Sequence, residues 1–221
     1  MFVTKGKNIV EMNRRELGGI VSDCERVIFD IGAGSGKFIY RLAKENQNAL
    51  CIGLETSQDS LLEYARKIEK KPERGGLSNV IYVIGSIESP PDDLKEIADE
   101  IFINYPWTNM LKALIAGDYA LLKKIHSLFR SDGILNLTVS YDRRYEEKFI
   151  TDYKLPELSE DFLQNTLAPA YEKCGFKIKS FEKLDSTEMR KSFSEWGKRL
   201  AFGRERIAWR MKFVRVSSVD S

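Results

Sequence analysis

The feature that most constrains this chain is the regular alternation of short apolar, β-rich runs with amphipathic helical patterns. The apolar runs lie at residues 26–30, 49–54, 80–84, 100–104 and 133–139. Helical patterns separate them at residues 37–45, 60–70 and 118–129. Strands that alternate with helices in this way form βαβ units, so we expect an α/β fold with a mainly parallel sheet.

The pattern changes after about Ser140. Residues 159–174 predict a helix that is interrupted near Pro169, because proline lacks the amide hydrogen that a helix interior needs. Further elements are expected as a strand at 176–183, a helix at 187–200 and a strand at 207–216. The last two strands would form an antiparallel hairpin that completes a seven-stranded sheet. The first ten residues predict a small β extension, and residues 1–221 predict a single domain because no linker or repeat interrupts them.

A glycine-rich turn joins the first predicted strand to the first predicted helix. It reads Asp-Ile-Gly-Ala-Gly-Ser-Gly from Asp30 to Gly36. Glycine lets the backbone turn sharply and approach a ligand, and doubly wound sheets bind nucleotides at the carboxyl ends of their strands. The turn is not a P-loop, because Ile31 stands where the earlier glycine is required and Phe38 replaces Ser or Thr.

Two carboxylates beside this turn indicate which nucleotide it binds. Glu55 ends the second strand, where it can accept both ribose hydroxyls of an adenosyl group. Asp30 would repel a dinucleotide pyrophosphate but would attract a methionyl ammonium. These residues favour S-adenosylmethionine over NAD, and a tight turn without a ligand remains the structural alternative. Gly85 to Glu88, after the third strand, are expected to contact adenine, although Glu88 could be a solvated loop acid.

Aromatic residues mark the predicted reacting centre. Asn104-Tyr105-Pro106-Trp107 follows the fourth strand and partly matches the Asn/Asp-Pro-Pro-aromatic motif of amino methyltransferases. Trp107 offers a flat face on which a base can stack, and its alternative role is in the core or in a lid. Trp196 lies among arginines, which suits an aromatic surface beside bound phosphates.

Charge is distributed unevenly along the chain. The net charge is only +2, but residues 190–215 contain nine basic and two acidic residues. Such a concentration indicates a polyanionic partner, since a solvated face more often mixes the two signs. A second basic segment, residues 66–74, could bind the same partner or could be a solvated helix end.

Several classes of site are disfavoured. The three cysteines form no CxxC pair, so neither a zinc site nor a disulfide framework is indicated. The single histidine, His126, excludes a multi-histidine metal site and is interpreted as structural, and we expect no bound metal. No apolar run approaches the roughly 18 residues that span a bilayer. We therefore expect a cytoplasmic protein with no membrane partner.

Several of these segments together resemble one family. They are Lys70-Lys71-Pro72, Gly75 to Val80, Pro106-Trp107, and Trp196 with Lys198 to Arg204. With them the chain resembles the aminoglycoside-resistance 16S rRNA (adenine-1408-N1) methyltransferases of the kanamycin–apramycin type, over nearly its whole length. The resemblance implies a class I S-adenosylmethionine-dependent methyltransferase fold, with a mainly parallel seven-stranded sheet and a small N-terminal β extension. It also implies a monomer that methylates adenine 1408 in helix 44 of 16S rRNA within the 30S subunit.

The resemblance also implies roles for individual residues. Trp107 and Trp196 would hold the flipped adenine, and Ser194 would help to place it. The cofactor would be bound by Asp30, Gly32, Ala33, Gly34, Gly36, Glu55, Thr56, Ile87, Glu88, Asn104, Pro106 and Thr108. The rRNA would be gripped by Lys67, Lys70, Lys71, Arg199, Arg204 and Arg206.

The departures from the family pattern are modest. Glu55 stands where some relatives have Asp, and Asn104 and Tyr105 are less apolar than expected before Pro106. Three other functions remain open: a tRNA guanine-N7 methyltransferase, a nicotinamide-dependent oxidoreductase, and a non-catalytic rRNA-binding assembly factor.

Overall fold

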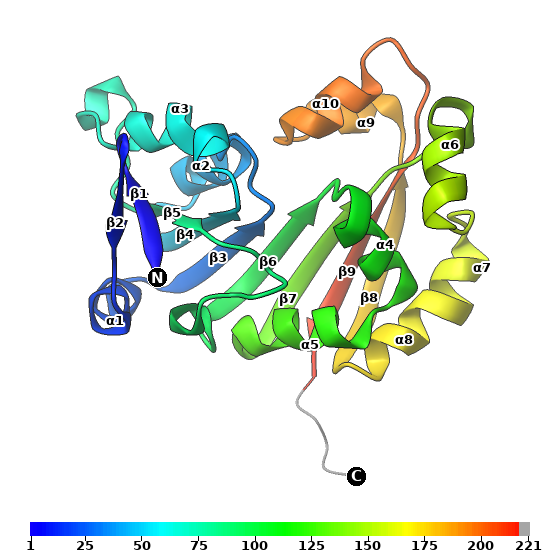
Figure 1. Ribbon diagram of the computed structural model, residues 1–221, viewed down its shortest axis with the longest axis horizontal. Coiled ribbons are helices and arrows are strands. Elements are labelled where there is room, and N and C mark those ends of the chain that lie inside the picture. The colour runs from blue at the N-terminus through cyan, green and yellow to red at the C-terminus, as the bar shows by residue number, and fades with distance from the viewer. Residues whose placement is uncertain (217–221) are drawn as a thin grey trace. The chain divides into compact units, whose positions relative to one another are not determined.

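The computed structural model describes residues 1–216 and divides into two compact units (Figure 1). The first unit contains residues 1–102 and 127–130, and the second contains residues 103–126 and the described residues from 131 onward. Three elements cross this division: β6 (Ala98–Asn104), α5 (Tyr119–Leu128) and β7 (Phe129–Val139).

The first unit is an α/β structure with parallel central strands. Its other elements are β1 (Phe2–Lys5), β2 (Asn8–Glu11), α1 (Arg14–Ser22), β3 (Arg26–Ile31), α2 (Lys37–Glu45), β4 (Ala49–Glu55), α3 (Gln58–Ile68) and β5 (Val80–Ile84). The strand order is β2-β1-β5-β4-β3-β6. The pairs β3–β4, β4–β5 and β3–β6 are parallel, whereas β1 pairs antiparallel with both β2 and β5.

The core of this unit follows from its apolar runs. In β4, residues 49–54 are all buried, as expected for a parallel strand that is covered on both faces. Helix α2 buries Ile39, Tyr40 and Ala43, which share one helical face. The predicted β extension is confirmed as the hairpin β1–β2, which turns at Gly6 with φ +63°.

The second unit contains an antiparallel sheet with the strand order β7-β9-β8. Its remaining elements are α4 (Thr108–Ala116), α6 (Arg143–Tyr153), α7 (Glu160–Phe162), α8 (Ala168–Glu172), β8 (Phe176–Leu184), α9 (Ser186–Lys191), α10 (Glu195–Ala201) and β9 (Ala208–Arg215). The expected C-terminal hairpin is therefore confirmed. A π-helical turn at Leu163–Leu167 lies just before Pro169, where an interruption was expected.

One helix boundary was wrong. The sequence predicted a continuous helix over residues 187–200, but α9 ends at Lys191 and α10 begins at Glu195. Ser192 is extended, with ψ 159°, and the side chain of Ser194 caps α10 by accepting a hydrogen bond from Gly197 N at 3.2 Å. Serine competes with the helical backbone in this way, so the break places Ser194 and Trp196 at a helix start.

Candidate functional site

The turn between β3 and α2 adopts a conformation that requires glycine. Gly32, Gly34 and Gly36 all have positive φ, at 74°, 54° and 76°. At Gly36 an added Cβ would lie 2.4 Å from the ring of Tyr82, whose hydroxyl donates to Gly36 O at 2.9 Å. The amides of Gly32 and Ala33 both donate to Leu54 O, at 2.9 and 3.1 Å. The turn is therefore held against the end of β4 by its own backbone.

Glu55 ties the glycine turn to the end of β4. Its Oε2 accepts a hydrogen bond from Gly34 N at 2.9 Å. Its Oε1 accepts from Thr56 N at 2.9 Å, Thr56 Oγ1 at 3.0 Å and Ser57 N at 3.1 Å. Donors of this number stabilise the charged carboxylate and fix its direction. Glu55 therefore lies beside the glycine turn, and its predicted contact with ribose hydroxyls stays a prediction.

Asp30 lies at the carboxyl end of β3 and is only 3% exposed. Burial and then the negative charge of Asp30 raise the pKa of Tyr82, so the phenol stays protonated and keeps donating to the turn. In the loop after β5, Ile87 is buried, and Glu88 is exposed and accepts a hydrogen bond from Ser86. Glu88 is thus accessible to solvent, which both of its expected roles allow.

These residues fit an adenosyl-sulfonium cofactor by their donor and acceptor chemistry. A Cβ added at Gly34 would meet nothing within 4 Å, so the outside of the turn is open to a ligand. The fixed carboxylate of Glu55 can accept ribose hydroxyls through its remaining lone pairs, and the buried Asp30 provides the negative charge that an ammonium group requires. Within residues 1–216, no group of three or more His, Cys, Asp or Glu residues could hold a metal ion.

The segment that follows β6 begins the second unit and contains strained backbone. Tyr105 and Thr108 have φ values of 52° and 50°, a left-handed conformation that is uncommon for residues with side chains. Pro106 is buried between them, and the buried Nδ2 of Asn104 has no hydrogen-bond acceptor among the described residues. Strain and unpaired polar groups of this kind concentrate at functional sites.

Trp107 and Trp196 both belong to the second unit, and both remain exposed. Trp107 is the N-cap residue of α4 and is 36% exposed, and Trp196 is the second residue of α10 and is 45% exposed. One face of Trp107 stacks on Phe149 of α6, with 4.2 Å between ring centroids and 4° between planes. Trp209, in contrast, is 4% exposed on β9 and belongs to the core.

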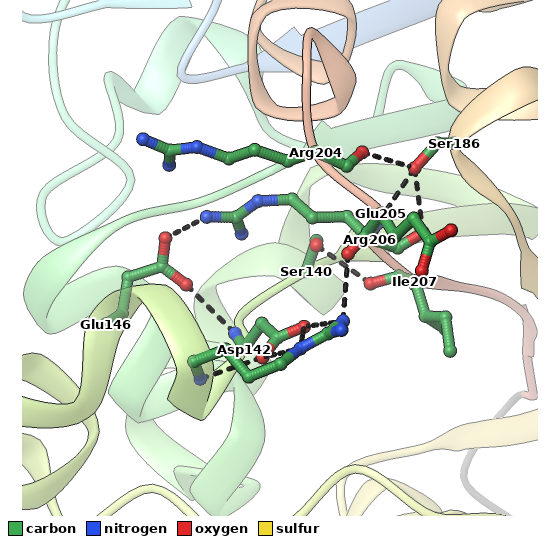
Figure 2. Close-up of polar contacts among 9 residues, drawn as sticks. Ser140, Asp142, Glu146, Ser186, Arg204, Glu205, Arg206 and Ile207 are labelled. Atoms are coloured by element: carbon green, nitrogen blue, oxygen red, sulfur yellow. Dashed lines mark hydrogen bonds and ion pairs between the residues drawn. The ribbon is translucent and has the colours of Figure 1, made fainter.

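The predicted RNA-binding arginines fall into two groups. Arg199 and Arg204 are exposed, as phosphate contacts require. Arg206 is 2% exposed and forms an ion pair with Glu146 (Figure 2). Its guanidinium carbon also lies 5.0 Å from the ring centroid of Tyr145. Its Nε and Nη1 atoms have no hydrogen-bond partner among the described residues, so the assignment of Arg206 to the rRNA stays a prediction.

The residues that hold the loop from Arg204 to Arg206 were not predicted from the sequence. The single hydroxyl proton of Ser186 is shared between Arg204 O at 2.9 Å and Arg206 O at 3.2 Å, and Ser186 Oγ accepts from Arg206 N at 2.8 Å (Figure 2). Arg144 donates to Glu205 O at 2.8 Å and also to Asp142, whose pKa it lowers. The Asp185–Glu188 capping box is a sequence signal that could have located Ser186 at the start of a helix.

An open pocket of about 730 Å³ lies over this loop. Four arginines line it: Arg144, Arg190, Arg204 and Arg206. Two acids, Asp185 and Glu205, also reach the lining, so the arginines outnumber the carboxylates. Guanidinium groups pair with phosphate oxygens through two parallel hydrogen bonds, and this pocket is thus suited to a phosphate group.

Two tyrosines contact the basic segment of the first unit, residues 66–74, or the loop that follows it. Lys70 and Lys71 are exposed, whereas Lys67 Nζ lies 4.5 Å from the ring centroid of Tyr40 and 5.2 Å from that of Tyr64. The hydroxyl of Tyr40 donates to the carbonyl of Gly75 at 2.8 Å. Lys67 is therefore partly engaged within the protein, and Lys70 and Lys71 are the lysines that face solvent.

Comparison with known proteins adds to this geometry. The family model NpmA, described as 16S rRNA (adenine(1408)-N(1))-methyltransferase, matches residues 3–215. A protein of that description from Escherichia coli is 37% identical over 212 residues, which are 96% of this chain and 97% of the relative.

Two solved structures confirm the expected fold class. An antibiotic-related methyltransferase is 33% identical, with a TM-score of 0.86, and the match covers 96% of this chain and 99% of that one. The aminoglycoside resistance methyltransferase NpmB1 is 27% identical, with a TM-score of 0.82, over 98% of this chain and 100% of that one. In residues 1–216, no helix has both the length and the apolar character that a membrane span needs.

Proposed function

This chain belongs to the family of 16S rRNA (adenine(1408)-N(1))-methyltransferases, and on this basis we propose that it methylates N1 of adenine 1408 in 16S rRNA. S-adenosylmethionine is the methyl donor of such an enzyme. The observation that carries the proposal is the exposure of two indoles, Trp107 and Trp196, at the starts of two helices of one unit. An indole exposed to water is unfavourable and often marks a binding site. An unstacked base is a ligand that can cover such a ring by stacking on it.

The residues around the glycine turn would hold the cofactor. Asp30 would bind the methionyl ammonium, Glu55 the ribose hydroxyls, and Ile87 the adenine ring, while Gly32 to Gly36 would let the backbone approach. Thr56, Glu88, Asn104, Pro106 and Thr108 complete the proposed set. When bound, S-adenosylmethionine supplies an electrophilic methyl group on its sulfonium sulfur.

N1 of adenine, the methyl acceptor, must be positioned but does not need to be deprotonated. N1 of an unpaired adenine carries a free lone pair, so it can form the new N–C bond without a general base while the C–S bond breaks. We therefore assign Trp107 and Trp196 to hold the base and Ser194 to orient it. The hydroxyl of Ser194 accepts from Gly197 N, and its own proton can still be donated. Holding the base in line with the methyl group contributes to the rate in the same way as an intramolecular reaction.

We propose that the base reaches the enzyme by flipping out of helix 44 in the assembled 30S subunit. Flipping costs a few kcal/mol of lost stacking. Stacking on aromatic side chains offsets this by roughly 1–3 kcal/mol per base. Phosphate contacts from Arg199, Arg204, Lys70 and Lys71 would position the rRNA, because these side chains face solvent. The methylated adenine is cationic and would weaken the binding of polycationic aminoglycosides, so the activity would confer resistance.

We further propose that the chain works as a monomer and as one methyltransferase domain, in the cytoplasm where assembled subunits are found. The match of one family model to residues 3–215 supports a single functional unit. The nicotinamide-dependent alternative loses its support, because the family that matches transfers methyl groups.

Primer extension on purified subunits tests this proposal. The protein and S-adenosylmethionine are incubated with 30S subunits, with protein-free 16S rRNA and with tRNA, and each RNA is then reverse transcribed. N1 methylation blocks base pairing, so we expect a strong stop beside position 1408 in 30S samples only. N7-methylguanine still pairs with cytosine and gives no stop, so the tRNA is also digested and its nucleosides are analysed by mass spectrometry. N7-methylguanosine confined to tRNA would support the guanine-N7 alternative. Binding to 30S subunits without any modification would support the non-catalytic assembly factor.

A further inference from the structure

The buried ring of Tyr105 fills the space that a side chain at position 197 would need. Tyr105 is 6% exposed and packs in a cluster with Leu184, Met189, Ala201 and Ala208. A Cβ added at Gly197 would lie 2.6 Å from Tyr105 Cε2 and 2.8 Å from Cζ. Real Cβ atoms do not approach a ring so closely, so glycine at this position lets the ring lie directly against the backbone of α10.

This contact joins the two segments that carry the exposed indoles. Trp107 follows Tyr105 by two residues in the segment after β6, and Trp196 directly precedes Gly197 in α10. The backbone of Tyr105 is fixed independently, because its amide donates to Thr138 O in β7 at 2.7 Å. The backbone of Tyr105 is thus held by β7, and its ring packs on α10, the helix that carries Trp196.

Each indole-bearing segment has other restraints that act on it alone. The stack on Phe149 sets the plane of Trp107. The Ser194 cap sets the start of α10, and Met189 and Ala201 bury the same side of α9 and α10 against Tyr105. Tyr105 touches α10 at both Gly197 and Ala201, and its contact with Gly197 is the one next to Trp196. Tyr105 also keeps a left-handed φ of 52° that a residue with a side chain adopts only where packing enforces it.

We propose that Tyr105 is a positioning residue: its ring, seated on Gly197, sets the separation of Trp107 and Trp196 so that both indoles can engage one base. The inference rests on the proposed function and specifies how its base-holding site is shaped. Burial raises the pKa of Tyr105 to about 12, so the ring stays neutral at every pH at which the enzyme would be assayed. The proposed role therefore belongs to the volume of the ring and not to a charge on its oxygen.

An experiment that enlarges residue 197 and shortens residue 105, singly and together, distinguishes a positioning role of Tyr105 from a purely structural one. The variants are Gly197→Ala, Tyr105→Leu and the double variant, with Tyr105→Phe as the control that keeps the ring. Leucine does not reach the ring positions that a Cβ at residue 197 would meet, so the double variant removes the clash. For each variant, kcat on 30S subunits, the Kd for S-adenosylmethionine, the Kd for 30S subunits and the thermal midpoint are measured.

We expect Gly197→Ala to lower kcat by about 10-fold or more, since displacements on the order of 1 Å have effects of this size. Both Kd values and the activity of Tyr105→Phe should stay within about two-fold of the parent. Tyr105→Leu alone should also lower kcat. If the two substitutions acted independently, the relative kcat of the double variant would be the product of the two single relative kcat values. We expect it to be higher than this product by about five-fold or more, because residues in contact couple.

Three results would overturn the inference. They are an unchanged kcat in Gly197→Ala, strictly multiplicative effects in the double variant, and loss of activity in Tyr105→Phe. If Gly197→Ala does not fold, Tyr105→Leu decides, since a folded Tyr105→Leu with normal kcat contradicts the role. Failure of the proposed function is distinguishable, because the unsubstituted protein would then leave 30S subunits unmodified.

Discussion

In the first unit, the turn between β3 and α2 is closed by hydrogen bonds from its own neighbourhood, whereas in the second unit the indoles of Trp107 and Trp196 remain exposed. The turn needs glycine at Gly36 because Tyr82 leaves no room for a side chain. Phe149 stacks on one face of Trp107, and the Ser194 cap fixes the start of the helix that carries Trp196. Part of each indole nevertheless remains exposed to solvent. A turn that is already ordered can bind a small cofactor. A base that belongs to a large RNA can be bound only by side chains that are accessible on the protein surface.

The largest expected effect comes from removing both indoles. The double variant Trp107→Ala/Trp196→Ala should lose about 100-fold or more in kcat/KM on 30S subunits, since each stacked base contributes roughly 1–3 kcal/mol. Calorimetry should show unchanged binding of S-adenosylmethionine. Tyr119→Ala is the matched control, because Tyr119 is 61% exposed on α5 of the same unit. Normal turnover in the double variant would remove the distinction between the two regions.

The glycine turn can be tested through stability. Gly36→Ala should lower the free energy of unfolding by about 2–4 kcal/mol, because it adds backbone strain and a clash with Tyr82. Gly34→Ala adds strain alone, since a Cβ there meets nothing within 4 Å, and should cost about 1–2 kcal/mol. Urea titrations of both variants measure the difference. Equal losses in the two variants would show that the turn is not closed against Tyr82 as described.

The exposed and buried arginines should respond differently. Arg204→Glu should weaken 30S binding by about 10-fold at moderate salt while leaving thermal stability and cofactor binding intact. Arg206→Ala should instead lower stability, by about 3 kcal/mol, because it leaves the partly buried carboxylate of Glu146 without its cation. Lys173→Glu, at an exposed position after α8, makes the same charge change as Arg204→Glu and controls for net charge. Equal 30S affinity of Arg204→Glu and the parent would argue against the arginine surface.

The smallest expected effect concerns His126. Burial and then the charge of Arg215 hold the pKa of His126 below its ordinary value of 6.5. The unfolded chain therefore binds more protons just below pH 6.5, so stability should fall slightly as the pH drops through this value and level off below the folded pKa. His126 is the only histidine, so His126→Gln should abolish this part of the pH profile. A profile that is unchanged in His126→Gln would contradict the assignment.

The local features of the first unit could be predicted because they depend on neighbours in the sequence. The apolar runs predicted β3, β4 and β5, and the glycine spacing predicted the turn. Residues 143–153 were not recognised as a helix, because α6 is polar and its first turn is non-helical at Glu146. The same helix supplies Glu146 to Arg206, across 60 positions.

For this reason the burial of Arg206 could not be inferred from its charged neighbours in the sequence. Contacts of this range depend on the tertiary fold, and composition alone favours an exposed arginine. The same holds for the stack of Phe149 on Trp107 and for the seat of Tyr105 on Gly197. The sequence located both indoles, and the structure adds what holds them in place.

The most direct test of the central claim is mass spectrometry of the 16S rRNA fragment that contains position 1408. The 30S subunits are first incubated with the protein and with S-adenosylmethionine that carries a deuterated methyl group. We predict one labelled methyl group on adenine 1408, in a nucleoside that co-elutes with authentic N1-methyladenosine. Label at another nucleotide or at another nitrogen of this adenine, or no label at all, would contradict the proposed reaction.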